Sequence, residues 1–206
     1  MNSIDANRDA YEPFAAKRRR DQLFARSRPF VRRLDWANDF WVLWAAYDLD
    51  SFPKMPKGLT REQFAQMLQK ILSTHSSILL VEDDNKHFRN GRGPCALVAV
   101  DNFGWRIEPH VEFFRWASDR IKLRSYVAFF QLAKNSEDFG VCVVRCPKQY
   151  STFIRRLSRY CLLHPCGMVP KGSRYGDEYL YSIESRLARH GARKLEAPVD
   201  ERRVAA

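Results

Sequence analysis

The chain has 206 residues, of which 45% are hydrophobic and 13% aromatic, and its formal net charge is +11. A chain of this length and hydrophobic content can bury a core, so we exclude wholesale disorder and expect one domain with tails. The excess of lysine and arginine favours anionic partners, such as nucleic acid, an anionic cofactor or an acidic protein. No apolar run reaches the length of about 18 residues that a membrane span needs, and the N-terminus lacks the apolar segment of a signal peptide. We therefore expect no membrane span and a cytoplasmic protein.

The first third of the chain combines a basic arm, an apolar run and a capped helix. Residues 1–38 carry clustered arginines interleaved with phenylalanine and leucine, and we interpret them as an arm that holds a basic helix. This arm would dock on phosphates or on a partner, or would merely keep the protein in solution. The run 39–48 (DFWVLWAAYD) predicts a core strand, with or without a helical lead-in. Thr60 and Gln63 match a capping box, and the apolar residues that follow on one face predict a helix over residues 61–73.

The middle of the chain alternates strands with one long helix. We predict strands at residues 77–82 (SILLVE), 95–100 (CALVAV) and 105–115 (WRIEPHVEFFR). The turn 101–104 (DNFG) joins the last two as an antiparallel hairpin. Ser118 or Asp119 then caps an amphipathic helix that runs to about residue 135.

The last third of the chain contains shorter elements and a second tail. We predict strands at 139–145, 168–169 and 178–183, and a helix from 151 to about 161. Residues 186–206 form a basic tail, so the folded domain is expected over 39–185. The five cysteines, an odd number, argue against a disulfide framework. Cys161, His164 and Cys166 are three potential metal ligands without an evident fourth, and we expect no metal site.

The junction after the strand 105–115 is the candidate anion site. A strand that ends at a helix N-terminus points free N–H groups and the positive end of the helix dipole at one place, and such a place binds phosphate. The polar and basic residues around this junction are Arg115, Ser118, Asp119, Arg120, Lys122 and Arg124. We predict that these residues bind the phosphate groups of a cofactor; for Ser118 and Asp119 an ordinary helix cap is the alternative.

The order of the predicted elements over residues 41–185 resembles that of the GNAT superfamily of N-acetyltransferases. The resemblance implies an α+β (three-layer α/β) fold with a mixed, mostly antiparallel central sheet and helices on both faces. It also implies transfer of an acyl group from acetyl-CoA to an amine. The strand 139–145 would splay from 105–115 to make the cleft, and the turn 115–120 (RWASDR) would hold the pyrophosphate. The stretch 105–118 is also similar to small GNAT-like proteins encoded by tailed bacteriophages, some of which are thought to be virion components.

The match to the GNAT motifs is partial. The pyrophosphate pattern Gln/Arg-x-x-Gly-x-Gly/Ala is met by Arg115, but Ser118 and Arg120 stand at its glycine positions. Arg120 could reach a phosphate with its guanidinium or could fill the site. In the later helix, Ile154 stands where the family often has a tyrosine that protonates the departing thiolate.

The strand before the junction also carries the candidates for a general base. Acylation of an amine needs a base that takes a proton. Strand alternation puts Glu108, His110 and Glu112 on one face, with successive members about 7 Å apart, so one can act while its neighbour tunes it. The alternative is a solvated sheet face whose acids pair with Arg106 and Arg115.

Three functions remain open from the sequence. The first is an acyl-CoA-dependent N-acyltransferase with an unknown amine acceptor. The second is a non-catalytic phage virion or assembly protein that contacts DNA or neighbouring subunits through its basic arms. The third is a nucleic-acid-binding protein that uses aromatic side chains beside lysine and arginine, although most aromatics here follow core periodicity.

Overall fold

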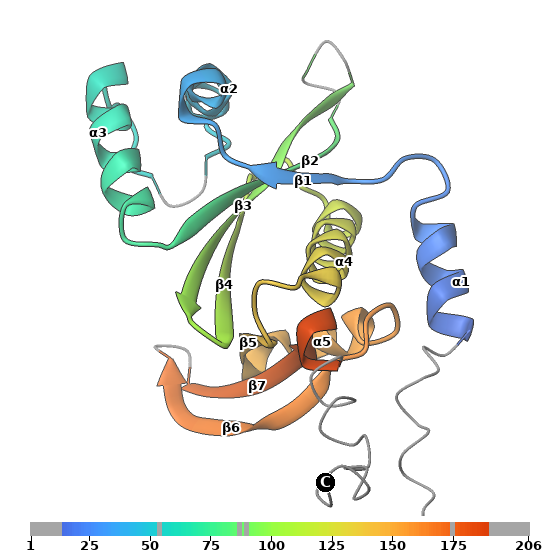
Figure 1. Cartoon of the computed structure of the whole chain (residues 1–206). Helices are drawn as coiled ribbons and strands as arrows, with labels where there is room; N and C mark the ends of the chain where they lie inside the picture. The colour runs from blue at the N-terminus through green and yellow to red at the C-terminus, as the bar shows by residue number, and fades with distance from the viewer. Residues whose placement is uncertain (1–13, 53–54, 86–87, 89–90, 174–175, 190–206) are drawn as a thin grey trace, which may run out of the picture.

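The computed structural model describes residues 14–52, 55–85, 88, 91–173 and 176–189. A seven-stranded sheet runs through the molecule in the order β1-β2-β3-β4-β5-β7-β6 (Figure 1). The strands are β1 (Phe30–Arg33), β2 (Ser77–Asp84), β3 (Arg92–Phe103), β4 (Arg106–Phe113), β5 (Val141–Pro147), β6 (His164–Ser173) and β7 (Gly176–Glu184). The α-helices are α1 (Phe14–Leu23), α2 (Trp36–Asp48), α3 (Arg61–Leu72), α4 (Asp119–Asn135) and α5 (Ser151–Leu157). Every neighbouring pair of strands is antiparallel except β4 and β5, which confirms the mixed, mostly antiparallel sheet.

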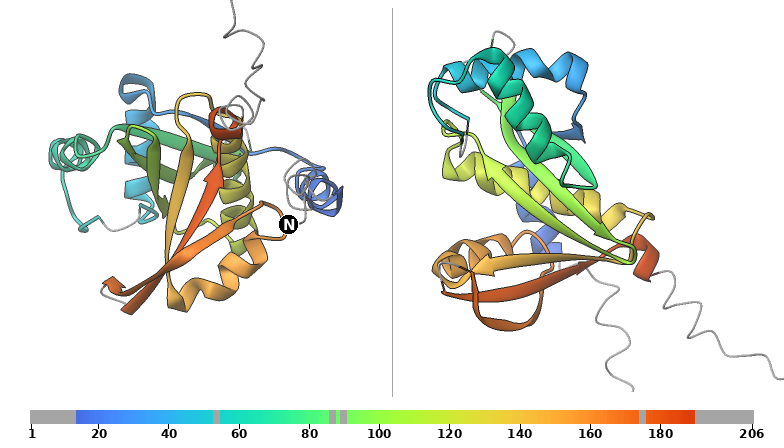
Figure 2. Two further views of the ribbon diagram at one scale, coloured as in Figure 1. Left: turned by 60° about the horizontal axis from the view of Figure 1, so that its bottom comes forward. Right: turned by 90° about the vertical axis from the view of Figure 1, so that its left-hand side faces the viewer.

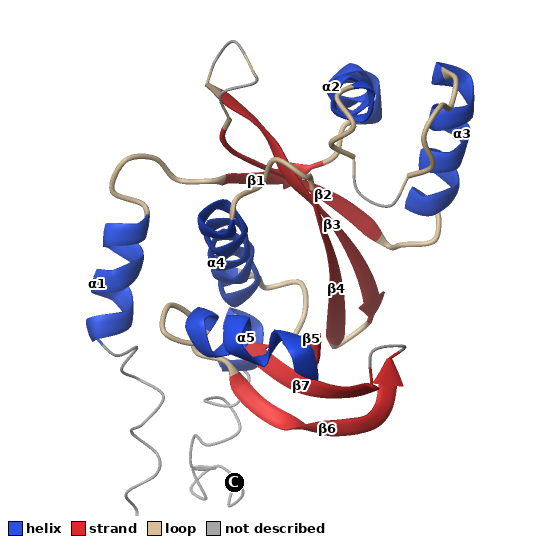
Figure 3. Ribbon diagram, turned by 180° about the vertical axis from the view of Figure 1, so that it is seen from behind, coloured by secondary structure: helices blue, strands red, loops and turns tan. Residues whose placement is uncertain are grey.

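Helices cover both faces of this sheet, which confirms the three-layer arrangement (Figures 1 and 3). On one face α4 and α5 bury Leu123, Val127 and Leu157 against inward-facing residues of β2 to β5. On the other face α2 and α3 form a second core around Leu43 and Phe64. Burying such side chains is the main term that stabilises the layers. None of the helices in the described part of the chain is both long enough and apolar enough to cross a membrane.

The segment 39–48, predicted as a core strand, is helical and belongs to α2. Its buried residues Asp39, Leu43 and Ala46 are spaced four and three apart, which is the period of a helix face. Asp35 caps the helix, because its side chain accepts bonds from the N–H groups of Ala37 and Asn38. The strand prediction was wrong because a continuous apolar run of this length fits a buried strand and a buried helix equally well.

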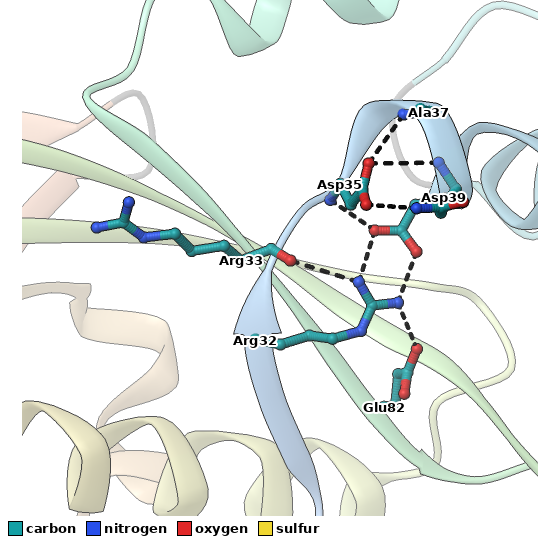
Figure 4. A network of polar contacts seen from close by, with 7 residues as sticks. Arg32, Arg33, Asp35, Ala37, Asp39 and Glu82 are labelled. Atoms are coloured by element: carbon teal, nitrogen blue, oxygen red, sulfur yellow. Dashed lines mark hydrogen bonds and ion pairs between the residues drawn. The ribbon is translucent and has the colours of Figure 1, made fainter.

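The basic segment before α2 also contributes to the fold. Residues 30–38, which the sequence analysis assigns to the arm, form β1 and the first turn of α2, and β1 pairs antiparallel with β2. Arg32 fastens this edge, as Figure 4 shows: its guanidinium donates to both carboxylate oxygens of Asp39, at 2.5 and 2.6 Å, and to Glu82 at 2.8 Å. Burial opposes ionisation of Asp39, but the bonds from Arg32 and the Asp35 N–H outweigh it and hold the pKa of Asp39 below its usual value.

Two predictions based on short sequence motifs, a helix cap and a hairpin turn, are confirmed. Thr60 and Gln63 make the expected capping box at the start of α3. Gly104, with a φ of 77°, closes the β3–β4 hairpin, a conformation that suits glycine. The strands β6 and β7 form a longer hairpin than the short segments predicted there. Residues 190–206, most of the predicted basic tail, lie outside the described part of the chain.

Candidate active-site groove

The strands β4 and β5 pair over a short distance and then separate. Their parallel register consists of Arg106 with Val141 and Ile107 with Cys142. In the right-hand view of Figure 2 the orange and red strands diverge from the green ones beyond this point. A groove of about 1620 Å³ opens between the two strands. Its existence matches the cleft that the GNAT resemblance implies.

The closed end of the groove is formed where β4 and β5 begin. The carbonyl of Trp105 accepts bonds from the N–H groups of both Gly140 and Val141, at 2.8 and 3.1 Å. The indole of Trp105 lies so close to Gly140 that a Cβ there would be 1.9 Å from a ring carbon. A side chain at position 140 would therefore displace the Trp105 indole, while the two backbone bonds hold the strands together at this end.

Apolar side chains make up much of the groove wall. Tyr126 of α4 lies between two rings, with its centroid 5.3 Å from that of Phe113 and 5.3 Å from that of Phe153. Burial raises the pKa of the Tyr126 hydroxyl well above its usual value, so this group stays neutral. Val111 and Val143 line the same groove from β4 and β5. A wall of this kind suits an elongated, largely uncharged ligand segment.

Basic side chains from two helices also line the groove. They are Lys122 of α4, Arg155 and Arg156 of α5, and Arg159 just beyond α5. The three arginines are exposed to solvent. The guanidinium of arginine and the ammonium of lysine are the side-chain groups that bind phosphate most strongly. These arginines were not predicted as site residues, although Arg155, Arg156 and Arg159 form a basic cluster that is visible in the sequence.

The start of α4 has the cap that the sequence predicts. Ser118 is the N-cap, and its hydroxyl accepts a bond from the N–H of Ile121. Asp119 is exposed over 86% of its side chain and lies 3.5 Å from the ammonium of Lys122. Ser118 and Arg120 are exposed but are not among the residues that line the groove. Of the predicted phosphate-binding residues, Arg115, Asp119 and Lys122 line it.

Arg124 points away from the groove. Only 4% of its side chain is exposed, and it donates to Asp83 at 2.7 Å and to the carbonyl and hydroxyl of Ser27 at 2.8 and 2.7 Å. The bonds tie α4 to β2 and to the segment before β1. The guanidinium of Arg124 is thus part of a buried ion pair, and Arg124 is not among the residues that line the groove.

The three candidates for a general base lie on one wall of the groove but differ in surroundings. Glu108 is buried, and it accepts a bond of 2.9 Å from Arg145 of β5 and lies 3.2 Å from Arg106. His110 is half exposed, and its Nε2 lies 2.9 Å from a carboxylate oxygen of Asp101. Glu112 lies partly buried in the same wall. The carboxylate of Glu108 is already paired with two arginines, whereas the His110 side chain is half exposed and lines the groove.

His110 belongs to a three-residue cluster that the sequence analysis did not find. Asp101 of β3 bridges it to His75, whose Nδ1 lies 2.8 Å from the second carboxylate oxygen of Asp101. The bond with His75 and then that with His110 hold the pKa of Asp101 below its usual value, so the carboxylate is ionised. His75 lies 26 positions before Asp101 in the chain, and only the pairing of β2, β3 and β4 brings the three together.

Comparison with known proteins rests on structure alone. No protein-family model matches the chain, and no curated protein matches it. The ribosomal-protein-S5-alanine acetyltransferase of Vibrio fischeri superposes with a TM-score of 0.54 at 13% identity, over 78% of this chain and 94% of that one. A probable GNAT-family acetyltransferase from Chromobacterium violaceum has a TM-score of 0.51 at 14% identity, over 77% of this chain and 83% of that one. A ribosomal L7/L12 alpha-N-protein acetyltransferase in complex with coenzyme A has a TM-score of 0.50 at 14% identity, over 78% and 96%. These similarities show that the chain has the GNAT fold.

Proposed function

We propose that this chain, which has the GNAT fold, is an acyl-CoA-dependent N-acyltransferase that works in the groove between β4 and β5. The observation that carries the proposal is the separation of these strands beside a cluster of basic side chains. The structural neighbours support it, because they are acetyltransferases and one of them was solved in complex with coenzyme A.

The groups that line the groove match the parts of an acyl-CoA. Lys122, Arg155, Arg156 and Arg159 would bind its phosphates through charge-assisted hydrogen bonds. The apolar wall around Tyr126 would contact its extended arm. β4 has no β5 partner beyond Ile107, so its backbone groups on that side can pair with the amides of an extended chain.

His110 is the residue that we assign as general base. In the transfer, the amine nitrogen would form a C–N bond with the acyl carbon while the C–S bond of the thioester breaks, coenzyme A would leave as a thiolate that takes up a proton, and the amine would lose a proton. Asp101 holds Nε2 of His110, which leaves Nδ1 to take that proton, and the ionised carboxylate stabilises the imidazolium that results. Glu108 joins β4 to β5 through Arg145 and acts as a positioning residue. Glu112 is the second candidate for the base.

Calorimetric titration of the full chain with acetyl-CoA tests cofactor binding. We expect binding with one site, weakened by about tenfold in Arg156→Ala because one charged hydrogen bond is lost. Arg120→Ala is the matched control, since it removes an exposed positive charge that lies outside the groove. The absence of binding by the unmodified protein would refute the proposal. Equal weakening by the two variants would indicate that the phosphates bind at the N-terminus of α4 instead of at α5.

Release of free thiol from acetyl-CoA in the presence of a panel of amines tests the chemistry. Loss of a general base costs about 10²- to 10⁴-fold in rate, so we expect His110→Ala to lower kcat by this factor while acetyl-CoA affinity changes little. If Glu112→Gln has this effect and His110→Ala does not, the base is Glu112. A non-catalytic assembly role for the basic arms stays a prediction, and it becomes the better account if acetyl-CoA does not bind.

A further inference from the structure

His75, Asp101 and His110 place three metal-ligating atoms in one small volume. One nitrogen from each histidine and one carboxylate oxygen all lie within 4.8 Å of one another. The residues come from three segments: His75 precedes β2, Asp101 lies on β3 and His110 on β4. Their side chains are 20%, 26% and 50% exposed, so an ion can enter from solvent. This is the one group of three or more histidine, cysteine or acidic residues of this kind in the described part of the chain.

We propose that these three residues form a binding site for a divalent transition-metal ion of the Zn²⁺ type. Two imidazoles and one carboxylate are the ligands that such ions prefer, with water in the remaining positions. Mg²⁺ and Ca²⁺ prefer several oxygen ligands, and the cluster offers a single carboxylate.

The separations between the three ligand atoms are close to those that an ion requires. Tetrahedral ligands at about 2.0 to 2.1 Å from Zn²⁺ are roughly 3.3 Å from one another. The carboxylate oxygens of Asp101 are already 2.8 and 2.9 Å from the two nitrogens. The two rings have centroids 5.5 Å apart and are tilted by 40° to each other, and one nitrogen of each lies within 4.8 Å of the other and of a carboxylate oxygen of Asp101. The backbone of β3 and β4 is held by eight register pairs, so the positions of Asp101 and His110 are fixed relative to each other.

Binding of Zn²⁺ to the full chain, after treatment with a chelator, is the direct test. We expect a stoichiometry of one by calorimetry, with affinity at least about tenfold lower in each of His75→Ala, Asp101→Asn and His110→Ala. Mg²⁺ in place of Zn²⁺ is expected to give no binding. Circular dichroism of each variant shows that a loss of binding is not a loss of folding.

Thiols are the main competing ligands, so the controls address them. Cys166 is the exposed free cysteine among the described residues, and it lies close in sequence to His164. Cys166→Ser and His164→Ala are expected to bind Zn²⁺ like the unmodified chain. Co²⁺ substitution adds a second readout, because a histidine and carboxylate site gives no thiolate charge-transfer absorption. The proposal is overturned if Zn²⁺ does not bind, if the two control variants lose binding, if the cluster variants retain it, or if Mg²⁺ binds equally well.

A consequence of the metal site rests on the proposed function. An ion coordinated by His110 would prevent this residue from taking a proton, so Zn²⁺ is expected to inhibit acyl transfer, and His75→Ala is expected to relieve the inhibition. The binding measurements above do not depend on activity. Failure of the acyltransferase proposal therefore leaves the metal site testable, and failure of Zn²⁺ binding leaves His110 available as a base.

Discussion

Replacement of Arg124 by methionine is the change that best tests our account of how α4 is attached. Methionine keeps much of the length of the side chain but removes the charge that faces Asp83. The Asp83 side chain is fully buried, and it would keep its bond of 2.8 Å from the N–H of Asp84. An unpaired carboxylate would then remain inside the protein.

The expected loss of stability follows from this burial. Removing one partner of a buried ion pair costs about 3 to 5 kcal/mol, because the other charge is left without compensation. The total stability of a domain is typically about 5 to 15 kcal/mol, so the variant would be folded but clearly weakened. Replacing both partners, as in Asp83→Asn with Arg124→Met, is expected to cost less than Arg124→Met alone.

The loss should also depend on pH in a defined direction. Burial raises the pKa of Asp83 above its usual value, and Arg124 and the Asp84 N–H oppose this rise. Without Arg124 the folded pKa rises further, so the folded state holds the proton more tightly than the unfolded chain does. Stability is then greatest below the unfolded pKa, about 3.9, and falls as the pH rises through the folded value. The difference between the variant and the unmodified chain should therefore be largest near neutral pH.

Urea denaturation followed by tryptophan fluorescence measures these differences. Arg120→Met is the matched control, since it makes the same chemical change on an exposed turn of the same helix and is expected to cost less than about 0.5 kcal/mol. A loss below about 1 kcal/mol for Arg124→Met, or a loss that does not vary with pH, would refute the buried pair. Acetyl-CoA affinity should be unchanged in the folded variant; a large decrease would return Arg124 to the cofactor site.

Three further predictions concern stability. Gly140→Ala would place a Cβ 1.9 Å from the Trp105 ring, so we expect a loss of about 1 to 3 kcal/mol from overpacking, measured by thermal denaturation; an unchanged Tm would mean that the indole moves freely. Phe64→Ala empties a fully buried site between α2 and α3 and should cost about 3 to 5 kcal/mol in urea denaturation, with Met67→Ala on the exposed face as its control. Thr60→Ala removes the capping box of α3 and should cost about 1 kcal/mol by the same assay, whereas a cost above about 3 kcal/mol would show a role beyond the cap.

The elements that the sequence predicted correctly have local causes. The Thr60–Gln63 box, the turn before Gly104 and the Ser118 cap each depend on residues a few positions apart. β1 could not be found in this way, because a four-residue strand with two arginines has no apolar periodicity and exists through its pairing with β2. The residues of α2 carried a strong apolar signal, but that signal did not distinguish a helix from a strand.

The same distinction between local and long-range causes applies to the residues of the candidate site. Strand alternation was enough to name Glu108, His110 and Glu112, since all three lie on one strand. His75 and Asp101 were missed because three-dimensional pairing, and not spacing in the chain, brings them to His110. The contact of Arg124 with Asp83 was missed for the same reason, since the two residues are 41 positions apart.

The short contact between β4 and β5 has a mechanical consequence. β3 and β4 share eight register pairs, whereas β4 and β5 share two, so the sheet consists of a block β1–β4 and a block β5, β7 and β6 joined along a narrow seam. Rotation of one block against the other would break few backbone hydrogen bonds, so resistance to a change in this coordinate, the width of the groove, comes mainly from α4, which packs on both blocks, and from the Glu108–Arg145 ion pair. A ligand that touches both blocks would stiffen this coordinate, and amide hydrogen exchange at Ile107 and Cys142 would slow when it binds.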